Sequence, residues 1–255
     1  MTVVFDMFSA EVLKLRRNRG LMAFTFLLTV GVIVLYFGYT AARHASNPAR
    51  YGPAGGLDDF QHAVRMLGLY FGGLAAILVG TEAGTADLSS GVFRDLVTTG
   101  RSRLALFAAR APAAVAVSVA FTTVAFALSA AATFQFAGGL PTPTASAILE
   151  SFGWMVLANA VLASLAVGVG SLTGSRGLTL TGVIGWQTIV SQLLLNATSL
   201  GSVRDGLLPA SLEQLAPMPA GIPFTVSTVA AIAVVVGWAA IPAAVGAWRT
   251  RTQDA

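Results

Sequence analysis

Residues 20–42 read GLMAFTFLLTVGVIVLYFGYTAA and contain no charged side chain. At a rise of about 1.5 Å per residue, a helix over this run is about 34 Å long, which is enough to cross the ~30 Å hydrocarbon core of a bilayer. A cleaved signal peptide has a shorter apolar part and no further spans behind it, so we expect a retained membrane helix here.

The composition supports the same fold class for the whole chain. The 255 residues are 55% hydrophobic and only 10% charged, with a mean hydropathy of +0.76, whereas soluble domains contain about 25% charged residues. The sequence has no cysteine, which excludes disulfides, thiolate metal sites and cysteine nucleophiles. We therefore expect a polytopic membrane protein.

Five further apolar runs alternate with polar segments, and together they predict an all-α integral membrane protein made of one transmembrane domain over residues 1–255. The expected spans are at about 20–42, 66–86, 104–136, 152–173, 178–197 and 222–248. Residues 43–65 and 198–221 are expected to be outer loops, because the first is polar and rich in Gly and Pro and the second has charged residues and several prolines.

Basic residues are distributed unequally between the two sides of the predicted membrane. Eleven lie on the side of the termini: Lys14, Arg16, Arg17, Arg19, Arg94, Arg101, Arg103, Arg110, Arg176, Arg249 and Arg251. Four lie on the other side: Arg43, Arg50, Arg65 and Arg204. The positive-inside rule then predicts that both termini are cytoplasmic. Because the basic residues flank apolar runs, the net charge of +4 does not indicate a nucleic-acid partner.

Residues 2–19 have apolar side chains at helical spacing, with charged side chains on the remaining surface. The apolar positions are Phe5, Phe8, Val12 and Leu15. This pattern predicts an amphipathic helix that lies along the inner headgroups of the membrane. The alternative is an ordinary charged tail.

Several motifs resemble those of other membrane proteins but lack a necessary part. Asn47-Pro48-Ala49 matches one half of the aquaporin signature, and no second copy exists. An intramembrane serine protease needs a base histidine inside the bilayer, yet His44 and His62 both fall in the first outer loop. Lys14 is the only lysine, so the chain has no phosphate-binding Gly-x-x-x-x-Gly-Lys loop. The sequence therefore predicts no catalytic site, and any dependence on ATP requires another chain.

The fifth predicted span has a polar face. It is formed by Gln187, Thr188, Ser191, Gln192 and Asn196. One interpretation is a face that contacts a substrate or a second subunit. The other is helix–helix hydrogen bonding, in which each contact contributes ~0.6 kcal/mol on average.

The longest charged interruption on the side of the termini runs from Glu82 to Arg110. Within it, apolar residues follow helical spacing and Gly100 provides a stop, which predicts a short amphipathic helix at about 87–99. Its apolar positions are Leu88, Val92, Phe93, Leu96 and Val97. Such a helix either lies flat on the inner leaflet or docks on a cytoplasmic protein.

In the order and spacing of these features the sequence resembles the permease subunits of type-2 ABC transporters. These have an amphipathic N-terminal helix and six spans with both ends inside. After the second span they have a Glu, a Gly-Thr, a short helix and a Pro-x-Ser-Arg-like turn. The corresponding residues here are Glu82, Gly84-Thr85, the helix at about 87–99, and Gly100-Arg101-Ser102-Arg103, with Gly100 in place of the usual Pro.

The resemblance implies a half-size subunit of an ABC exporter in a cell membrane, and we expect the bacterial cytoplasmic membrane. Its partners would be membrane lipids, a second identical or related permease and two cytoplasmic ATPase subunits, which would bind ATP and Mg²⁺. The permease itself would bind no cofactor and would not be an enzyme. The resemblance also implies a partly re-entrant outer segment before the sixth span.

In that family the short helix after the second span couples the permease to the ATPase. The residues that the resemblance assigns to this coupling region are Glu82, Asp87, Val92, Phe93, Arg94, Asp95, Arg101 and Arg103. Because a charge deep in a bilayer is costly, we expect Glu82 to pair with a basic residue such as Arg19 or Arg103. The expected substrate is a drug, an antibiotic, a peptide or a lipid-like molecule. The alternative functions are a stand-alone six-span secondary transporter and a non-transport membrane assembly protein.

Overall fold

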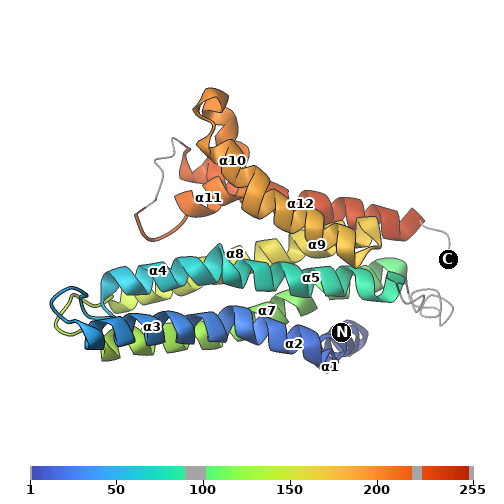
Figure 1. The fold of residues 1–255 in the computed structure, drawn as a ribbon. Coiled ribbons are helices and arrows are strands. Elements are labelled where there is room, and N and C mark those ends of the chain that lie inside the picture. Colours follow the sequence, from blue (N-terminus) through green and yellow to red (C-terminus); the bar gives the residue numbers. More distant parts are fainter. Residues whose placement is uncertain (1, 90–101, 220–225, 253–255) are drawn as a thin grey trace.

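A computed structural model describes residues 2–89, 102–219 and 226–252 (Figure 1). These residues form helices joined by turns, and no strand occurs among them. Six helical segments are long and apolar enough to cross a membrane. The predicted all-α class and the number of spans are therefore confirmed.

Three of the six candidate spans contain a change in helix type or a break. The first comprises α2 (Arg19–Phe26), a π-helical turn η1 (Leu27–Gly31) and α3 (Val32–Ser46), and the second comprises α4 (Leu57–Gly68) and α5 (Phe71–Ser89). The fifth comprises α9 (Arg176–Ile184), a π-helical segment η2 (Gly185–Val190) and α10 (Ser191–Asn196). The uninterrupted spans are α7 (Arg103–Gln135), α8 (Ala145–Thr173) and α12 (Thr228–Thr252).

The spans lie roughly side by side, with α8 at the centre in contact with α4, α5, α7, α9 and α12. In Figure 1 the first span and α7 lie on one side of the α5–α8 pair, and α9 to α12 lie on the other. The N-terminal helix and the end of α12 lie at the same end of the bundle, which we call the terminal end. The opposite end, where α3 connects to α4 and α7 to α8, is the loop end.

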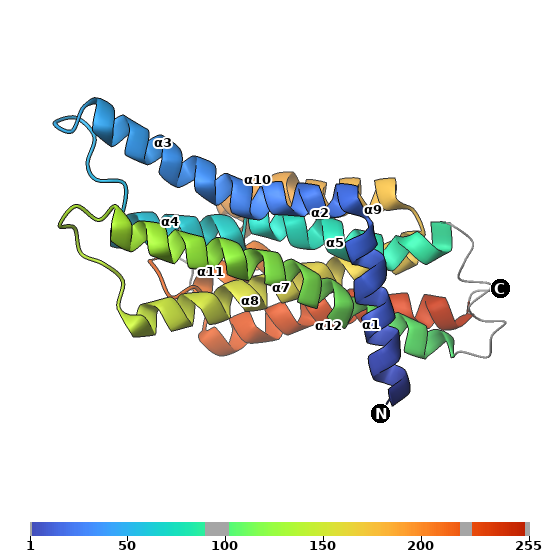
Figure 2. The ribbon, with the colours of Figure 1, turned by 90° about the horizontal axis from the view of Figure 1, so that it is seen from below.

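The amphipathic helix predicted at residues 2–19 is present as α1 (Thr2–Arg17). It crosses the ends of the spans at the terminal end instead of extending the bundle (Figure 2). Leu15 is fully buried, and Phe5 is 69% exposed. Asn18 separates α1 from α2, because its side-chain Oδ1 accepts a hydrogen bond from the backbone NH of Leu21 at 3.1 Å and so caps α2. This cap is where the chain turns from α1 into the first span.

The expectation of a loop over the whole of residues 43–65 is wrong. The loop ends at Gly56, and α4 follows, so the second candidate span is Leu57–Leu88. Four apolar side chains at helical spacing form the buried face of α4, and each is at most 1% exposed: Phe60, Ala63, Val64 and Leu67. The polar residues between them belong to the outer face of an amphipathic helix, and a search for uninterrupted apolar runs misses such a helix.

At the break between α4 and α5, a buried side-chain amide of α8 forms a hydrogen bond with the backbone. Asn159 is fully buried, and its Nδ2 donates to the backbone carbonyl of Leu67 at 3.0 Å and to that of Met155 at 2.8 Å. A carbonyl released by a helix break inside a membrane has no water to bond with. Asn159 supplies that partner, so it forms a hydrogen bond between α8 and the end of α4.

Replacing Asn159 with Leu is expected to lower stability by about 1–3 kcal/mol, the usual cost of leaving one buried polar group unsatisfied. The measurement is thermal unfolding of the purified chain in mild detergent, followed by tryptophan fluorescence. Asn196→Leu is the matched control, because Asn196 is exposed and its Nδ2 donates to the carbonyl of Gln192 within its own helix at 2.7 Å. Equal melting temperatures for the two variants would contradict this role of Asn159.

Residues 198–219 are also more ordered than the predicted loop. They form a 3-10 helix η3 (Thr198–Gly206) and a short helix α11 (Leu208–Gln214). Leu208 and Leu212 are fully buried, and the indole Nε1 of Trp154 on α8 donates to the carbonyl of Leu212 at 2.8 Å. The segment before the sixth span thus folds back against the bundle.

Close packing of α5 on α8 depends on small residues. A Cβ on Gly84 would lie 2.7 Å from the Val167 carbonyl oxygen and 3.2 Å from the Cα of Gly170. A Cβ on Gly246 of α12 would likewise lie 2.8 Å from the carbonyl oxygen of Gly168. Small residues let membrane helices approach closely, so Gly168 and Gly170 are packing positions.

Candidate functional site: an ionic cluster at the terminal end and a cavity between the spans

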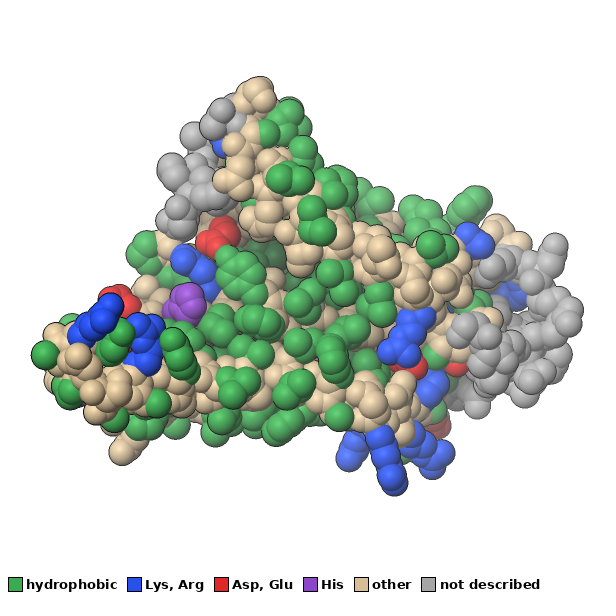
Figure 3. Space-filling model, in the orientation of Figure 1, with side chains coloured by type: hydrophobic (Ala, Val, Ile, Leu, Met, Phe, Trp, Pro, Cys, Tyr) green, Lys and Arg blue, Asp and Glu red, His purple; other side chains and the backbone are tan. Residues whose placement is uncertain are grey.

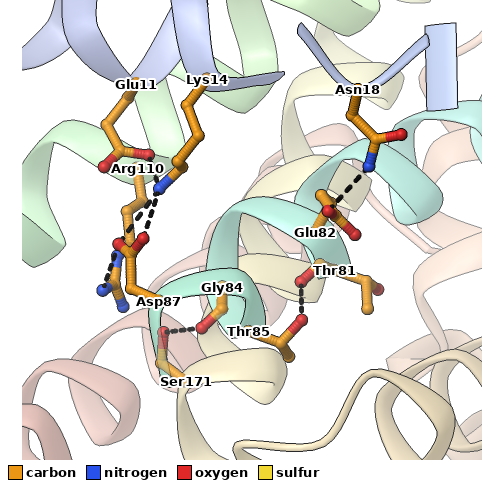
Figure 4. Close-up of polar contacts among 10 residues, drawn as sticks. All are labelled: Glu11, Lys14, Asn18, Thr81, Glu82, Gly84, Thr85, Asp87, Arg110 and Ser171. Carbon is orange, nitrogen blue, oxygen red and sulfur yellow. Dashed lines mark hydrogen bonds and ion pairs between the residues drawn. The ribbon is translucent and has the colours of Figure 1, made fainter. Parts of the chain in front are cut away.

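An ionic cluster connects three helices at the terminal end (Figure 4). Asp87, in the last turn of α5, accepts hydrogen bonds from Lys14 Nζ of α1 at 3.0 and 3.1 Å. Its Oδ2 also accepts from an Arg110 Nη atom of α7 at 3.0 Å. Glu11 pairs with Lys14 one turn earlier on α1. We call these four residues the Asp87 cluster.

The Asp87 cluster is largely removed from solvent. The side chain of Arg110 is fully buried, and that of Asp87 is 7% exposed. Burial raises the pKa of the Glu11 carboxyl, and the neighbouring Lys14 charge opposes that rise. Two acidic and two basic groups balance one another, which is the arrangement in which buried charges are tolerated. The cluster therefore holds α1 firmly against the ends of α5 and α7.

Glu82 forms a second polar contact on α5, one turn before Asp87. Its Oε1 accepts from Asn18 Nδ2 at 2.9 Å, and its Oε2 pairs with an Arg176 Nη atom at 3.2 Å. The expectation of a basic partner is correct, but the partner named from the sequence is wrong: it is Arg176, at the start of α9, and neither Arg19 nor Arg103. Because α9 packs beside α5, a residue 94 positions away (176 − 82) becomes a neighbour, which sequence spacing alone does not indicate.

Further polar contacts join α5 to itself and to α8 in the same region (Figure 4). Thr85 donates from Oγ1 to the carbonyl of Thr81 at 2.8 Å, within the helix. Ser171 of α8 donates from Oγ to the carbonyl of Gly84 at 3.4 Å. The last two turns of α5 are therefore bonded to α1, α7, α8 and α9.

The structure describes only part of the predicted coupling region. Glu82 and Asp87 lie in α5. Arg103 is the first residue of α7, and Ser102 caps that helix, because its Oγ accepts a hydrogen bond from the Ala105 NH at 3.2 Å. The rest of the predicted helix at 87–99 follows the end of α5 and lies outside the described residues. So do five of the predicted coupling residues: Val92, Phe93, Arg94, Asp95 and Arg101.

A cavity of about 450 Å³ lies where the α4–α5 break faces the fifth span and α11. Figure 3 shows the surface hollowed between the protruding α10 and the layer below it. Gln187, Thr188 and Gln192 line the cavity. The other two residues of the predicted polar face do not line it, since Ser191 is fully buried and Asn196 is exposed.

Two charged residues of this cavity were not predicted. Arg65 of α4 and Glu213 of α11 both line it, and Arg65 Nε lies 3.6 Å from Glu213 Oε1. Both residues were assigned to loops. The amphipathic spacing of residues 57–68 was the signal that Arg65 belongs to a helix, whereas no local pattern indicates that Glu213 faces it.

A family model described as ABC-2 family transporter protein matches residues 7–184. The chain belongs to the ABC-2 transporter family. The matched range runs from α1 into α9 and includes all of the Asp87 cluster and Glu82. No curated protein matches the chain.

Membership of the ABC-2 family makes this chain a multi-pass membrane protein and a permease component of an ABC transporter. Such permeases are transport components that are generally not catalytic themselves and that associate with an ABC ATPase and a membrane partner. Among residues 2–89, 102–219 and 226–252, no group of three or more His, Cys, Asp or Glu side chains is placed to hold a metal ion.

Proposed function

We propose that this chain is the permease of an ATP-driven exporter, with its terminal end in the cytoplasm and its energy supplied by separate ATPase subunits. ATP and Mg²⁺ would bind the ATPases, and this chain would hold no cofactor. Two ATPase subunits and a second permease, identical or related, would complete the transporter in the bacterial cytoplasmic membrane. The exported molecule would be a drug, an antibiotic, a peptide or a lipid-like compound.

The observation that carries this proposal is the position of α5. Phe71, Leu74 and Ile77 at one end of this helix line the cavity. Glu82 and Asp87 at its other end are bonded to α1, α7 and α9. A continuous helix between a cavity and a charged cluster moves as a rigid body. A push on the segment after α5 would then be transmitted to the walls of the cavity.

The distribution of charge in the described spans favours this proposal over a secondary transporter. Ion-coupled carriers usually have acidic residues or histidines near the middle of the membrane. Residues 20–42, 66–81, 111–135, 151–173, 177–196 and 228–248, which form the middle of the described candidate spans, contain no Asp, Glu or His. These stretches therefore offer no ion-coupling group of that kind.

Reversing two charges in the predicted coupling helix tests the proposal. The double variant Arg94→Asp with Asp95→Arg is expected to abolish ATP-driven export, because the pattern of mixed charge facing the ATPase is inverted. The ATPase subunits should still hydrolyse ATP, but hydrolysis should no longer respond to substrate. The measurement is export and ATP hydrolysis in proteoliposomes that contain this chain and the ATPase that co-purifies with it.

Arg249→Asp with Arg251→Asp is the control, because it changes charge at the same end, in the last turn of α12. It should leave export near the wild-type level. Transport by this chain alone, without ATP, would overturn the proposal, as would the absence of any ATPase from gently solubilised complexes.

A further inference from the structure

Three residues that line the cavity each have one buried polar atom without a hydrogen-bond partner in the described part of the chain. Arg65 Nε, Glu213 Oε2 and Gln187 Oε1 are buried and have no hydrogen-bond partner among the described residues. Arg65 Nε and Glu213 Oε1 are 3.6 Å apart, so the two side chains form an ion pair, but this distance is too long for a hydrogen bond. A second guanidinium nitrogen of Arg65 donates to the carbonyl of Pro219, which fixes the direction of the side chain.

Buried polar atoms in proteins are nearly always satisfied, and an exception requires an explanation. Here the three residues line one cavity and belong to three different elements: α4, η2 and α11. Burial also raises the pKa of the Glu213 carboxyl, with Arg65 opposing the rise. That carboxylate is therefore poorly solvated and would gain from a hydrogen-bond donor brought by a ligand.

The rest of the cavity is mainly apolar. Leu74 and Ile77 of α5 and Leu162 of α8 form one side of it. A cavity of about 450 Å³ is within the range of small-molecule sites, which combine an apolar lining with a few placed polar groups. An occupant therefore needs an apolar part and a polar head. Because Arg65 and Glu213 cancel each other, a head with a net charge would leave one of them opposed by a like charge.

We propose that this cavity binds an amphiphile whose polar head has no net charge and has both hydrogen-bond donors and acceptors. The head lies against Arg65, Glu213 and Gln187, and the apolar part lies along α5 and α8. This inference rests on the proposed function in one respect: the bound amphiphile is a substrate if the chain belongs to an exporter. Binding itself needs neither ATP nor an ATPase.

The test is equilibrium binding of three labelled dodecyl amphiphiles to the full chain in lipid nanodiscs, below their micellar concentrations. The heads are maltoside (uncharged and hydrogen-bonding), sulfate (anionic) and trimethylammonium (cationic). The maltoside is expected to bind about tenfold more tightly than either charged amphiphile, as expected for one well-made hydrogen bond to a charged group. Equal affinity for all three heads would overturn the proposal.

Two single variants then change the selectivity in opposite directions. Glu213→Gln leaves the Arg65 charge and should shift preference about tenfold toward the sulfate, and Arg65→Gln should shift it by a similar factor toward the trimethylammonium. The matched controls are Arg50→Gln and Glu150→Gln, because both residues are exposed at the loop end. Unchanged selectivity in both cavity variants would overturn the proposal.

A third variant tests the apolar side of the cavity. Leu74→Trp places a larger side chain there, at a residue that is only partly buried, and should weaken all three amphiphiles by the same factor, without a change in selectivity; weakening of the charged ones alone would contradict the assignment. These results are independent of the ATPase. Selective binding without ATP-driven export would overturn the proposed function only, and ATP-driven export without selective binding would overturn only this inference.

Discussion

Asp87→Asn is expected to destabilise the protein by about 3–5 kcal/mol, the usual cost of removing one partner from a buried ion pair. Asp87 contacts both Lys14 and Arg110. An amide in its place leaves the fully buried Arg110 guanidinium without that negative partner. The measurement is the unfolding midpoint in mild detergent, together with the yield of monodisperse protein.

The control for Asp87 is Asp58→Asn, because Asp58 is an exposed carboxylate in the first turn of α4. It should change stability by less than about 1 kcal/mol. The double variant Asp87→Asn with Arg110→Met should be less destabilised than the sum of the two single variants, because it removes both charges of the pair. A strictly additive double variant would show that Asp87 and Arg110 do not act as a pair.

A different substitution in the cluster, Lys14→Met, separates the cluster's structural role from its role in transport. Lys14→Met removes a partner that is partly exposed, with 32% of its side chain accessible. The cost in stability is therefore smaller than that of Asp87→Asn, since solvent screens an exposed charge. A folded Lys14→Met protein that hydrolyses ATP with its partner but exports poorly would indicate that attachment of α1 to α5 is needed for coupling.

The fold class could be predicted from the sequence because membrane spans obey a simple rule of length and polarity. Every span in lipid must satisfy its backbone internally and present apolar side chains, so residues 20–42 were sufficient to indicate the class. The rule fails for α4, because a helix partly covered by protein needs only one apolar face. Phe60, Val64 and Leu67 form that face. Asp58 and Arg65 lower the mean hydropathy of the segment, so a search by hydropathy does not find this helix.

The candidate site was predictable only in part, because its contacts join residues far apart in sequence. Glu82 and Asp87 could be singled out, since charge at a span end must be paired. Their partners Lys14, Arg110 and Arg176 depend on how α1, α7 and α9 pack around α5, which no local pattern determines. In the same way, Gln187 and Gln192 were identified by their shared helix face, whereas the Arg65–Glu213 pair arises only when α11 folds back.

Gly84→Leu is expected to have the other large effect, because α5 and α8 have no room for a side chain there. Even a Cβ would lie 2.7 Å from the Val167 carbonyl oxygen, and overpacking of this kind costs about 1–3 kcal/mol or more. The helices would have to separate, which would also break the bond from Ser171 to the Gly84 carbonyl. We expect a lower unfolding midpoint and loss of ATP-driven export together, because α5 would no longer hold its position between the Asp87 cluster and the cavity.

The matched control is Gly182→Leu in α9, where an added Cβ meets nothing within 4 Å; it should be neutral or slightly stabilising, since Leu is a better helix former than Gly. If both glycine variants melted at the wild-type temperature, the close contact between α5 and α8 could not be what holds this helix in place.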